Sequence, residues 1–347
     1  MSHLPETIPV RPAHRFDEIA LFAYLERTLD GFRRPAEIRQ FSGGQSNPTF
    51  AISTKDGKYV VRKKPPGKLL PSAHAVDREY RVMKALGAMG VPVPQLYLLC
   101  EDESIIGTSF YVMDYLAGRV FRDPRLPQMT SSDRTAIYDS MNLCLAKIHT
   151  ADLEALGLTD YGKPGNYFAR QISRWSRNYL AAETTKIEPV DQLIKWLPEN
   201  IPGGDQTSVV HGDFRLDNMI FHSKEPRVLA ILDWELSTLG HPLADLAYNC
   251  LPYYLTFGAS GGLASGKQIP GIPSEQKYVA TYCHRTASKI DRWNFYLAFS
   301  LFRSASIAQG VYKRALDGNA SSVTGIELGA HVAETATKAW ELAMQCD

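Results

Sequence analysis

The chain has 347 residues, 44% of them hydrophobic, and its 38 lysines and arginines nearly balance its 37 aspartates and glutamates. This balance leaves no excess of positive charge for binding nucleic acid or an anionic membrane surface, so a small, diffusible substrate is expected. The length favours two lobes, no apolar stretch could span a bilayer, and five scattered cysteines fit a reduced compartment, so we expect a soluble, cytoplasmic protein.

The first third of the chain has the pattern of a β-sheet accompanied by two helices. Strands are predicted over 37–41, 49–54, 58–62, 95–100 and 109–113. Apolar residues at helical spacing predict helices over 15–29 and 72–89. Short connections such as Asp56-Gly57 favour an antiparallel sheet, and we place the domain boundary after residue 114.

The connection between the first two strands is rich in glycine and serine. It reads Phe41-Ser42-Gly43-Gly44-Gln45-Ser46-Asn47-Pro48. The backbone N–H groups of such a loop can approach phosphate oxygens closely, so Gly43, Gly44, Ser46 and Asn47 are candidate nucleotide-binding residues. An ordinary hairpin loop has the same composition, so this segment alone does not decide between the two interpretations.

The remainder of the chain is mostly helical in its pattern. Helices are predicted over 132–149, 168–182, 190–196, 291–316 and 324–344. Nothing in the spacing selects Arg292, Arg303 or Tyr312 for an acceptor pocket.

Within this region, polar residues lie at the ends of a predicted strand hairpin over 219–233. Asn218 and Asp233 would fall at neighbouring ends of the hairpin, where an amide and a carboxylate offer the hard oxygen ligands that Mg²⁺ prefers. Asp213 lies on the loop ahead of them and is the candidate base for an acceptor hydroxyl. His211 is interpreted as a hydrogen-bonding strut for that loop. The alternative is that these acids are ordinary turn and strand-end residues.

The order H-G-D-x-x-x-x-N followed by I-L-D-W-E resembles the aminoglycoside phosphotransferase and choline kinase superfamily of small-molecule kinases. V-V-H-G-D-F-R-L-D-N-M-I-F with G-H-P-L-A-D-L-A-Y is most similar to phosphotransferase domains related to the amino-terminal kinase region of certain acyl-CoA dehydrogenase fusion proteins, from about Phe41 through Tyr248. The resemblance implies an α+β, two-lobed protein-kinase-like fold. It has a small antiparallel β-rich N-lobe (1–114) and a mostly helical C-lobe (115–347).

The resemblance also implies roles outside this motif. Kinases carry a phosphate-gripping cation on the strand over 58–62; strand alternation favours Arg62, with Lys63 as the alternative, and Glu79 would pair with it. Backbone groups near Asp114 and Leu116 would meet the adenine.

Two positions behind the catalytic loop also follow from the family pattern. Asp245 stands where the family has an acid that opens a helix behind the loop. Many members have an aspartate where this chain has His241.

The activity implied is Mg²⁺-dependent transfer of the γ-phosphate of ATP to a hydroxyl of a small molecule. A hydroxy acid or hydroxyacyl thioester is favoured over an aminoglycoside, because the segments expected to line the acceptor site do not gather acids. The alternatives are an inactive nucleotide-binding regulatory module, an antibiotic kinase, and a metal hydrolase that uses His211 and Asp213. The sequence determines neither the oligomeric state nor a preference for ATP over GTP.

Overall fold

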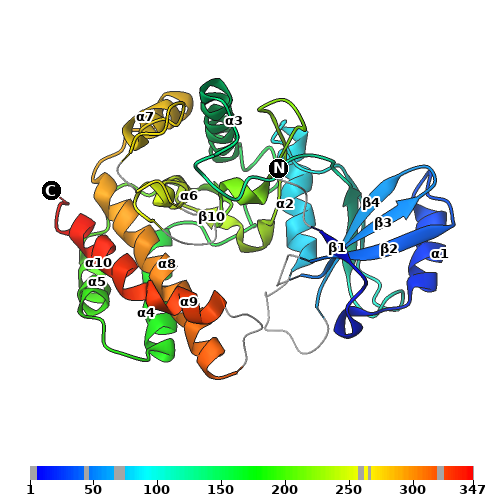
Figure 1. Cartoon of the computed structure of the whole chain (residues 1–347), viewed down its shortest axis with the longest axis horizontal. Helices are drawn as coiled ribbons and strands as arrows, with labels where there is room; N and C mark the ends of the chain where they lie inside the picture. Colours follow the sequence, from blue (N-terminus) through cyan, green and yellow to red (C-terminus); the bar gives the residue numbers. More distant parts are fainter. Residues whose placement is uncertain are drawn as a thin grey trace. The chain divides into compact units, whose positions relative to one another are not determined.

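A computed structural model describes residues 6–42, 47–65, 75–256, 262–264, 267–318 and 324–346 (Figure 1). The chain divides into two compact units. Unit 1 comprises Met1–Val120, Ala151–Tyr161 and Asn218–Ser237, and unit 2 comprises Phe121–Thr150, Gly162–Asp217 and Thr238–Asp347. The predicted lobe boundary after residue 114 stays a prediction. None of the described helices has both the length and the apolar character needed to cross a bilayer.

Unit 1 is built on an antiparallel sheet whose described strands follow the order β1-β2-β3-β4-β6-β5. These strands are β1 (Thr7–Ile8), β2 (Ala36–Phe41), β3 (Thr49–Thr54), β4 (Lys58–Lys63), β5 (Leu96–Cys100) and β6 (Phe110–Asp114). Helices α1 (Glu18–Thr28) and α2 (Val76–Ala88) and the 3₁₀ turn η1 (Pro12–His14) accompany the sheet.

The central strand β4 is buried on both faces, from Tyr59 to Lys63. Its odd-numbered side chains Tyr59 and Val61 join a core cluster with Leu21, Leu25 and other residues of α1. Because side chains alternate along a strand, Val60 and Arg62 point to the opposite face. Helix α2, which contacts β5 and β6, packs on that opposite face.

A short hairpin completes unit 1. Strands β8 (Met219–Phe221) and β9 (Val228–Ile231) pair antiparallel, with Met219 opposite Ile231. The 3₁₀ turns η2 (Leu216–Asn218) and η3 (Trp234–Leu236) lie next to the paired ends of the hairpin.

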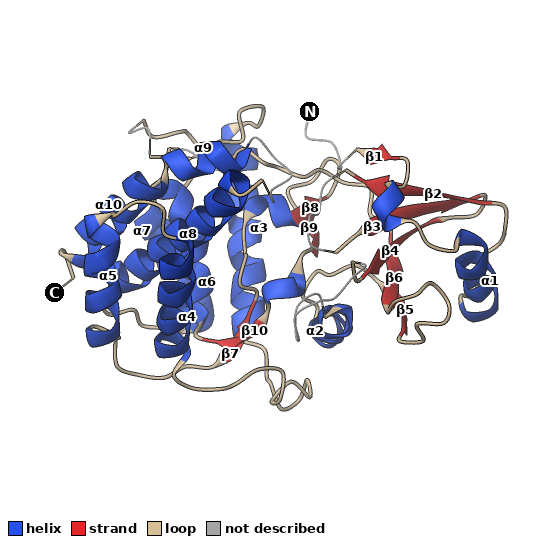
Figure 2. Cartoon of the chain, turned by 90° about the horizontal axis from the view of Figure 1, so that it is seen from below, coloured by secondary structure: helices blue, strands red, loops and turns tan. Residues whose placement is uncertain are grey.

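Unit 2 is mostly helical (Figure 2). Its helices are α3 (Ser131–His149), α4 (Tyr167–Ala182), α5 (Glu188–Glu199), α6 (Pro242–Asn249), α7 (Glu275–Thr286), α8 (Trp293–Leu316), α9 (Thr324–Ala330) and α10 (Val332–Ala343), with a 3₁₀ turn η4 (Leu251–Tyr253). Strands β7 (Ser208–Val210) and β10 (Thr238–Gly240) pair antiparallel.

Helix α8 lies at the centre of this unit, in contact with α4, α6 and α10. The ring of Phe168 on α4 packs edge-on against Phe295 and Phe299 of α8, with ring centroids 5.4 and 5.1 Å apart. Such aromatic packing buries large apolar areas and fixes the helices against one another. The predicted β-rich N-terminal part and helical C-terminal part are confirmed.

Two features of the helical part differ from the sequence prediction. The single helix expected over 324–344 is broken at His331 into α9 and α10. Gly329 allows α9 to approach α8 so closely that a Cβ there would lie 2.2 Å from the ring of Tyr312, and the chain then turns into α10. Helix α7 was not predicted; Ser274 caps its start, and the hydroxyl of Ser274 accepts a hydrogen bond from the N–H of Lys277.

Candidate functional site

The predicted cation of the small lobe is Arg62, and the structure brings it to Glu79. Its Nε lies 2.9 Å from Oε2 of Glu79, which projects from the first turn of α2. Asn47 Nδ2 donates to Glu79 Oε1 at 2.6 Å, and Tyr111 Oη donates to Oε2 at 3.1 Å. Glu79 is thereby held by one cation and two neutral donors inside unit 1.

The same guanidinium reaches two further carboxylates. Arg62 Nη2 lies 2.8 Å from Asp233 Oδ1 and 3.4 Å from Glu235 Oε2. Burial opposes the charged form of Arg62, but the charge of Glu79, supplemented by Tyr111, Asp233 and Glu235, raises its pKa above the ordinary value. Arg62 is therefore a permanent cation that joins β4, α2 and the turn after β9.

The alternative cation, Lys63, is only 3% exposed but lies on the other face of the sheet. Its Nζ lies 5.6 Å from the centroid of the Phe16 ring. Burial lowers the pKa of Lys63. Arg62 is the cation that pairs with Glu79, and its contact with nucleotide phosphates stays a prediction.

Asn218 and Asp233 lie at the same end of the β8–β9 hairpin. The N–H of Leu232 donates to the carbonyl oxygen of Asn218 at 2.8 Å, and Asp233 follows directly. Asp233 adopts a left-handed conformation, with φ at +67°, and its side chain is 37% exposed. An amide oxygen and a part-exposed carboxylate fit Mg²⁺, which usually takes one or two protein ligands and completes its shell with water and phosphate oxygens.

The residues of the predicted catalytic loop, 211–217, belong to unit 2, where Asp245 holds the loop backbone. Asp245 Oδ2 accepts the N–H of His211 at 2.5 Å, and Oδ1 accepts the N–H of Gly212 at 2.9 Å. Burial by itself would raise the pKa of Asp245, but the hydrogen bond and charge of His149 together with His211 and the Gly212 N–H lower it. A fully buried carboxylate at the start of α6 is thus ionised and serves as a backbone acceptor.

Asp213 lies next to two side chains that hold its carboxylate. Arg215 Nε lies 3.1 Å from Asp213 Oδ2, and Arg215 Nη1 also pairs with Asp217 at 3.1 Å. The hydroxyl of Tyr248 is hydrogen-bonded to Asp213; burial first, then the charge of Asp213, raises the pKa of Tyr248. His211 Nδ1 accepts the N–H of Asp213 at 3.2 Å, which agrees with its interpretation as a strut.

His241 occupies the start of α6, where many members of the proposed superfamily have an aspartate. Its Nδ1 accepts the N–H of Leu243 at 3.3 Å, so the imidazole caps the helix as an aspartate would. Burial lowers the pKa of His241 to about 4, and the ring is therefore neutral at pH 7.

The structure describes only some of the other residues that were predicted to contact the nucleotide. Gly43, Gly44 and Ser46 lie outside the described residues. Asn47 is described, but its side chain is buried and bonded to Glu79. The N–H of Asp114 donates to the carbonyl of Gln95 at 2.8 Å, whereas Leu116 lies beyond the last residue of β6.

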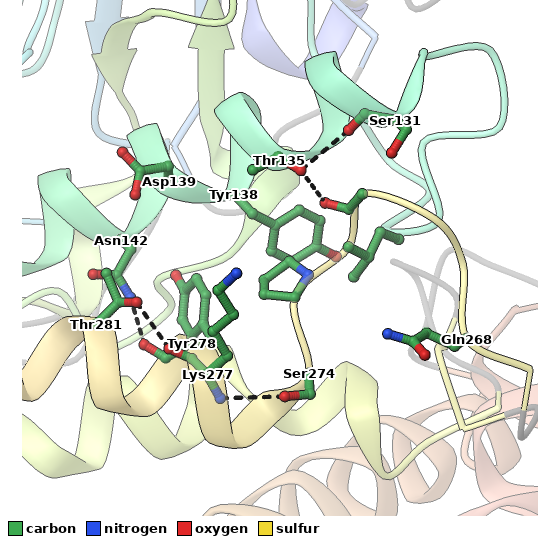
Figure 3. Close-up of a pocket in the computed structure, with 13 residues that line it drawn as sticks. Ser131, Thr135, Tyr138, Asp139, Asn142, Gln268, Ser274, Lys277, Tyr278 and Thr281 are labelled. Carbon is green, nitrogen blue, oxygen red and sulfur yellow. Dashed lines mark hydrogen bonds between the residues drawn. The ribbon is translucent and has the colours of Figure 1, made fainter.

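A separate cavity of about 380 Å³ lies between α3 and α7 (Figure 3). Asn142 Nδ2 donates to the carbonyl of Tyr278 in its wall, and Tyr278 Oη donates to Asn249 Oδ1 at 2.7 Å. Asn249 Nδ2 in turn donates to the carbonyl of Phe214 at 3.2 Å. None of its described lining residues is a predicted site residue.

The geometry agrees with what comparison of the whole chain reveals. The model of the family described as "Phosphotransferase enzyme family" matches residues 37–268. The chain belongs to this phosphotransferase family. A crystal structure from Ralstonia eutropha, provisionally named an aminoglycoside phosphotransferase, is 49% identical, with a TM-score of 0.88, and the match covers 96% of this chain and 100% of that one.

More distant phosphotransferases share the fold. Choline kinase from Cryptosporidium parvum is 12% identical, with a TM-score of 0.64 over 95% of each chain. Aminoglycoside phosphotransferase APH(4)-Ia, in a complex with AMP-PNP and hygromycin B, is 15% identical, with a TM-score of 0.61 over 94% of this chain and 98% of that one. The predicted two-lobed, kinase-like fold is therefore confirmed, and family membership supports a small-molecule phosphotransferase.

Sequence relatives of this phosphotransferase are longer proteins. Mouse (Mus musculus) acyl-CoA dehydrogenase family member 10 is 50% identical over 345 residues, which are 98% of this chain and 32% of that protein. The chicken (Gallus gallus) family member 11 is 47% identical over 97% of this chain and 45% of its own length. The chain thus spans less than half the length of each of these relatives.

Three residues next to the predicted site were not selected from the sequence. Glu235 stands two positions after Asp233 in I-L-D-W-E, and Tyr248 closes the segment G-H-P-L-A-D-L-A-Y, so a signal existed for both. Arg303, whose Nη2 donates to the carbonyl of Gly212 at 2.5 Å, had none.

Proposed function

We propose that this phosphotransferase transfers the γ-phosphate of ATP to a hydroxyl of a small hydroxy acid or hydroxyacyl thioester. Family membership supports the transfer of a phosphoryl group. The observation that carries the proposal is that each unit, taken by itself, holds side chains of the kinds that phosphoryl transfer needs. Arg62, Glu79, Asn218 and Asp233 are gathered in unit 1, and Asp213 is held on an ordered loop in unit 2.

Nucleotide binding is assigned to unit 1. Arg62, kept in place by Glu79, would meet the phosphates, while Asn218 and Asp233 would hold Mg²⁺. The metal, when bound, neutralises charge that develops on the phosphate oxygens. The related fold of APH(4)-Ia, which is described as a complex with AMP-PNP, supports ATP as the co-substrate. Gly43, Gly44, Ser46, Asp114 and Leu116 are retained as proposed nucleotide contacts.

The base is assigned to Asp213. In this role its carboxylate orients the acceptor hydroxyl and receives its proton as the new P–O bond forms. Arg215 and Tyr248 restrict the carboxylate to one orientation, which reduces the entropy lost in reaching the reactive geometry. Asp245 and His211 hold the backbone on which Asp213 is carried.

The charges next to Asp213 and the names of the relatives both favour an acceptor other than an aminoglycoside. Aminoglycosides are polycations, and a pocket for them should gather carboxylates. Next to the Gly212–Asp213 segment, Arg215 pairs with both Asp213 and Asp217, so a cation of the chain itself already balances these acids, which disfavours a polycationic acceptor. The chain also matches part of proteins named acyl-CoA dehydrogenases, which supports a hydroxylated acid or acyl thioester.

A coupled assay of ATP consumption tests the proposal. The purified chain is supplied with Mg²⁺ and a panel of hydroxy acids and hydroxyacyl thioesters, with aminoglycosides as a comparison class and Asp213→Asn as the control. Turnover that depends on a hydroxy acid or thioester and disappears in the control supports the proposal. Tight MgATP binding without turnover of any acceptor favours a regulatory module instead, and selective turnover of aminoglycosides favours an antibiotic kinase.

A further inference from the structure

A buried arginine of α8 contacts the catalytic loop. Arg303 is 6% exposed, and its Nη2 donates to the carbonyl oxygen of Gly212 at 2.5 Å. The N–H of the same glycine donates to Asp245. Gly212 has φ at +84°, a left-handed conformation that glycine adopts without strain. Both the N–H and the carbonyl group of Gly212, the residue before Asp213, are therefore hydrogen-bonded.

The guanidinium of Arg303 also faces two aromatic rings. It lies 5.0 Å from the ring centroid of Tyr248 and 5.7 Å from that of Trp175. The hydroxyl of Tyr248 is hydrogen-bonded to Asp213. Arg303 is thus connected to Asp213 by two routes, one through the backbone of Gly212 and one through the ring of Tyr248.

Burial of the Arg303 cation is not expected to add to the stability of the fold. Among the described residues it forms no ion pair, and its Nε is buried without a hydrogen-bond partner. A buried cation that is compensated by one carbonyl and two aromatic faces is an expensive way to join helices, since apolar side chains pack at least as well. Local departures from good packing concentrate at functional sites.

We propose that Arg303 is a positioning residue, which fixes the Gly212–Asp213 peptide and, through Tyr248, the carboxylate of Asp213. The inference rests on the proposed role of Asp213 as the base. A planar guanidinium suits this role best, because it donates to Gly212 while its flat face packs against the rings of Tyr248 and Trp175. Lysine would keep the charge and the donor but lose this stacking.

The same helix provides a matched control. Arg292, at the start of α8, donates through Nη1 to the carbonyl of Asn200 at 3.0 Å, and its Nε is likewise buried without a hydrogen-bond partner. Its Nη2 also donates to Asn200 Oδ1 at 3.1 Å. Arg292→Met therefore removes an arginine–carbonyl bond and a second hydrogen bond, both of them to Asn200 and neither to the catalytic loop. It should lower stability about as much as Arg303→Met and leave kcat unchanged.

Steady-state kinetics with the best hydroxy acid of the panel test the inference. Arg303→Met should lower kcat roughly 100-fold with the KM for ATP within about twofold of the wild type. Arg303→Lys should recover part of that loss, and Tyr248→Phe, which removes only the hydroxyl, should lower kcat roughly 10-fold. A kcat for Arg303→Met equal to that of Arg292→Met overturns the inference. If Arg303→Met does not fold, Arg303→Lys and Tyr248→Phe decide instead, and wild-type kcat in both overturns it.

Amide hydrogen exchange separates failure of this inference from failure of the proposed function. A peptide over residues 209–216 should exchange faster in Arg303→Met than in Arg292→Met. Equal exchange in the two variants overturns the positioning role. If the wild type turns over no acceptor, the proposed function fails, while the exchange comparison still tests whether Arg303 holds the loop.

Discussion

Replacing Asp245 by asparagine removes the acceptor that holds the catalytic loop in unit 2. The carboxylate accepts two backbone N–H groups, those of His211 and Gly212, and its side chain is 1% exposed. Asparagine has one acceptor oxygen, so its NH₂ group would face one of these donors. Loss of one charge-assisted bond and of the charge on the other should destabilise the fold by about 3 kcal/mol.

This destabilisation has a thermal and a kinetic consequence. A loss of about 3 kcal/mol should lower the melting temperature by about 6–12 °C in a unit of this size. Release of the Gly212 N–H should also displace Asp213 and lower kcat roughly 10- to 100-fold. Differential scanning calorimetry and the coupled ATP assay measure the two effects.

The control for Asp245→Asn is Asp317→Asn. Asp317 forms an exposed ion pair with Lys313 on α8, so its replacement should cost less than about 0.5 kcal/mol. A melting temperature for Asp245→Asn equal to that of Asp317→Asn would refute the reasoning, because it would mean that the buried carboxylate contributes no net hydrogen-bond energy.

The pH dependence of stability provides a second test of the role of Asp245. The fold lowers the pKa of Asp245 below its ordinary value of 3.8. A lowered pKa contributes stability that is fully present above the unfolded-state pKa of about 3.9 and is lost as the pH falls through the folded-state pKa. The stability difference between wild type and Asp245→Asn should therefore be constant above about pH 5 and shrink below pH 3.8. A difference that grows on acidification would contradict the sign of this argument.

Three further predictions concern the two units separately. Asp213→Asn should lower kcat by roughly 10²- to 10⁴-fold with little change in ATP affinity, and near-normal turnover in the coupled assay would remove its role as base. Asp233→Ala should abolish Mg²⁺-dependent ATP binding, measured by titration of a fluorescent ATP analogue; an unchanged Mg²⁺ dependence would contradict the metal assignment. Glu79→Gln should destabilise the protein by about 3 kcal/mol in urea unfolding, because it breaks a buried pair with Arg62, and a change below about 1 kcal/mol would count against that pair.

The order of the site motif and the class of the fold could be read from the sequence. His211, Gly212, Asp213 and Asn218 occur in a fixed order along one loop and hairpin, so local spacing alone predicts their proximity. Alternating and helical patterns likewise record which side chains an element buries, and they predicted a β-rich part followed by a helical part.

The choice between Arg62 and Lys63 illustrates the limit of such patterns. Strand alternation places the two on opposite faces, but β4 is central and both faces are buried, so burial alone does not distinguish them. Only the packing of α2 with Glu79 on one face and of Phe16 on the other identifies the partner of each cation.

By itself, the sequence indicated the phosphotransferase class, because the residues of the motif from His211 to Asp233 are close along the chain and occur in a fixed order. The tertiary structure decided how those residues are held. Arg303 lies 91 positions from Gly212, and Asp245 lies 33 positions from it. No local period connects residues so far apart, and only the packing of α6 and α8 around the loop brings a carboxylate to its N–H groups and a guanidinium to its carbonyl.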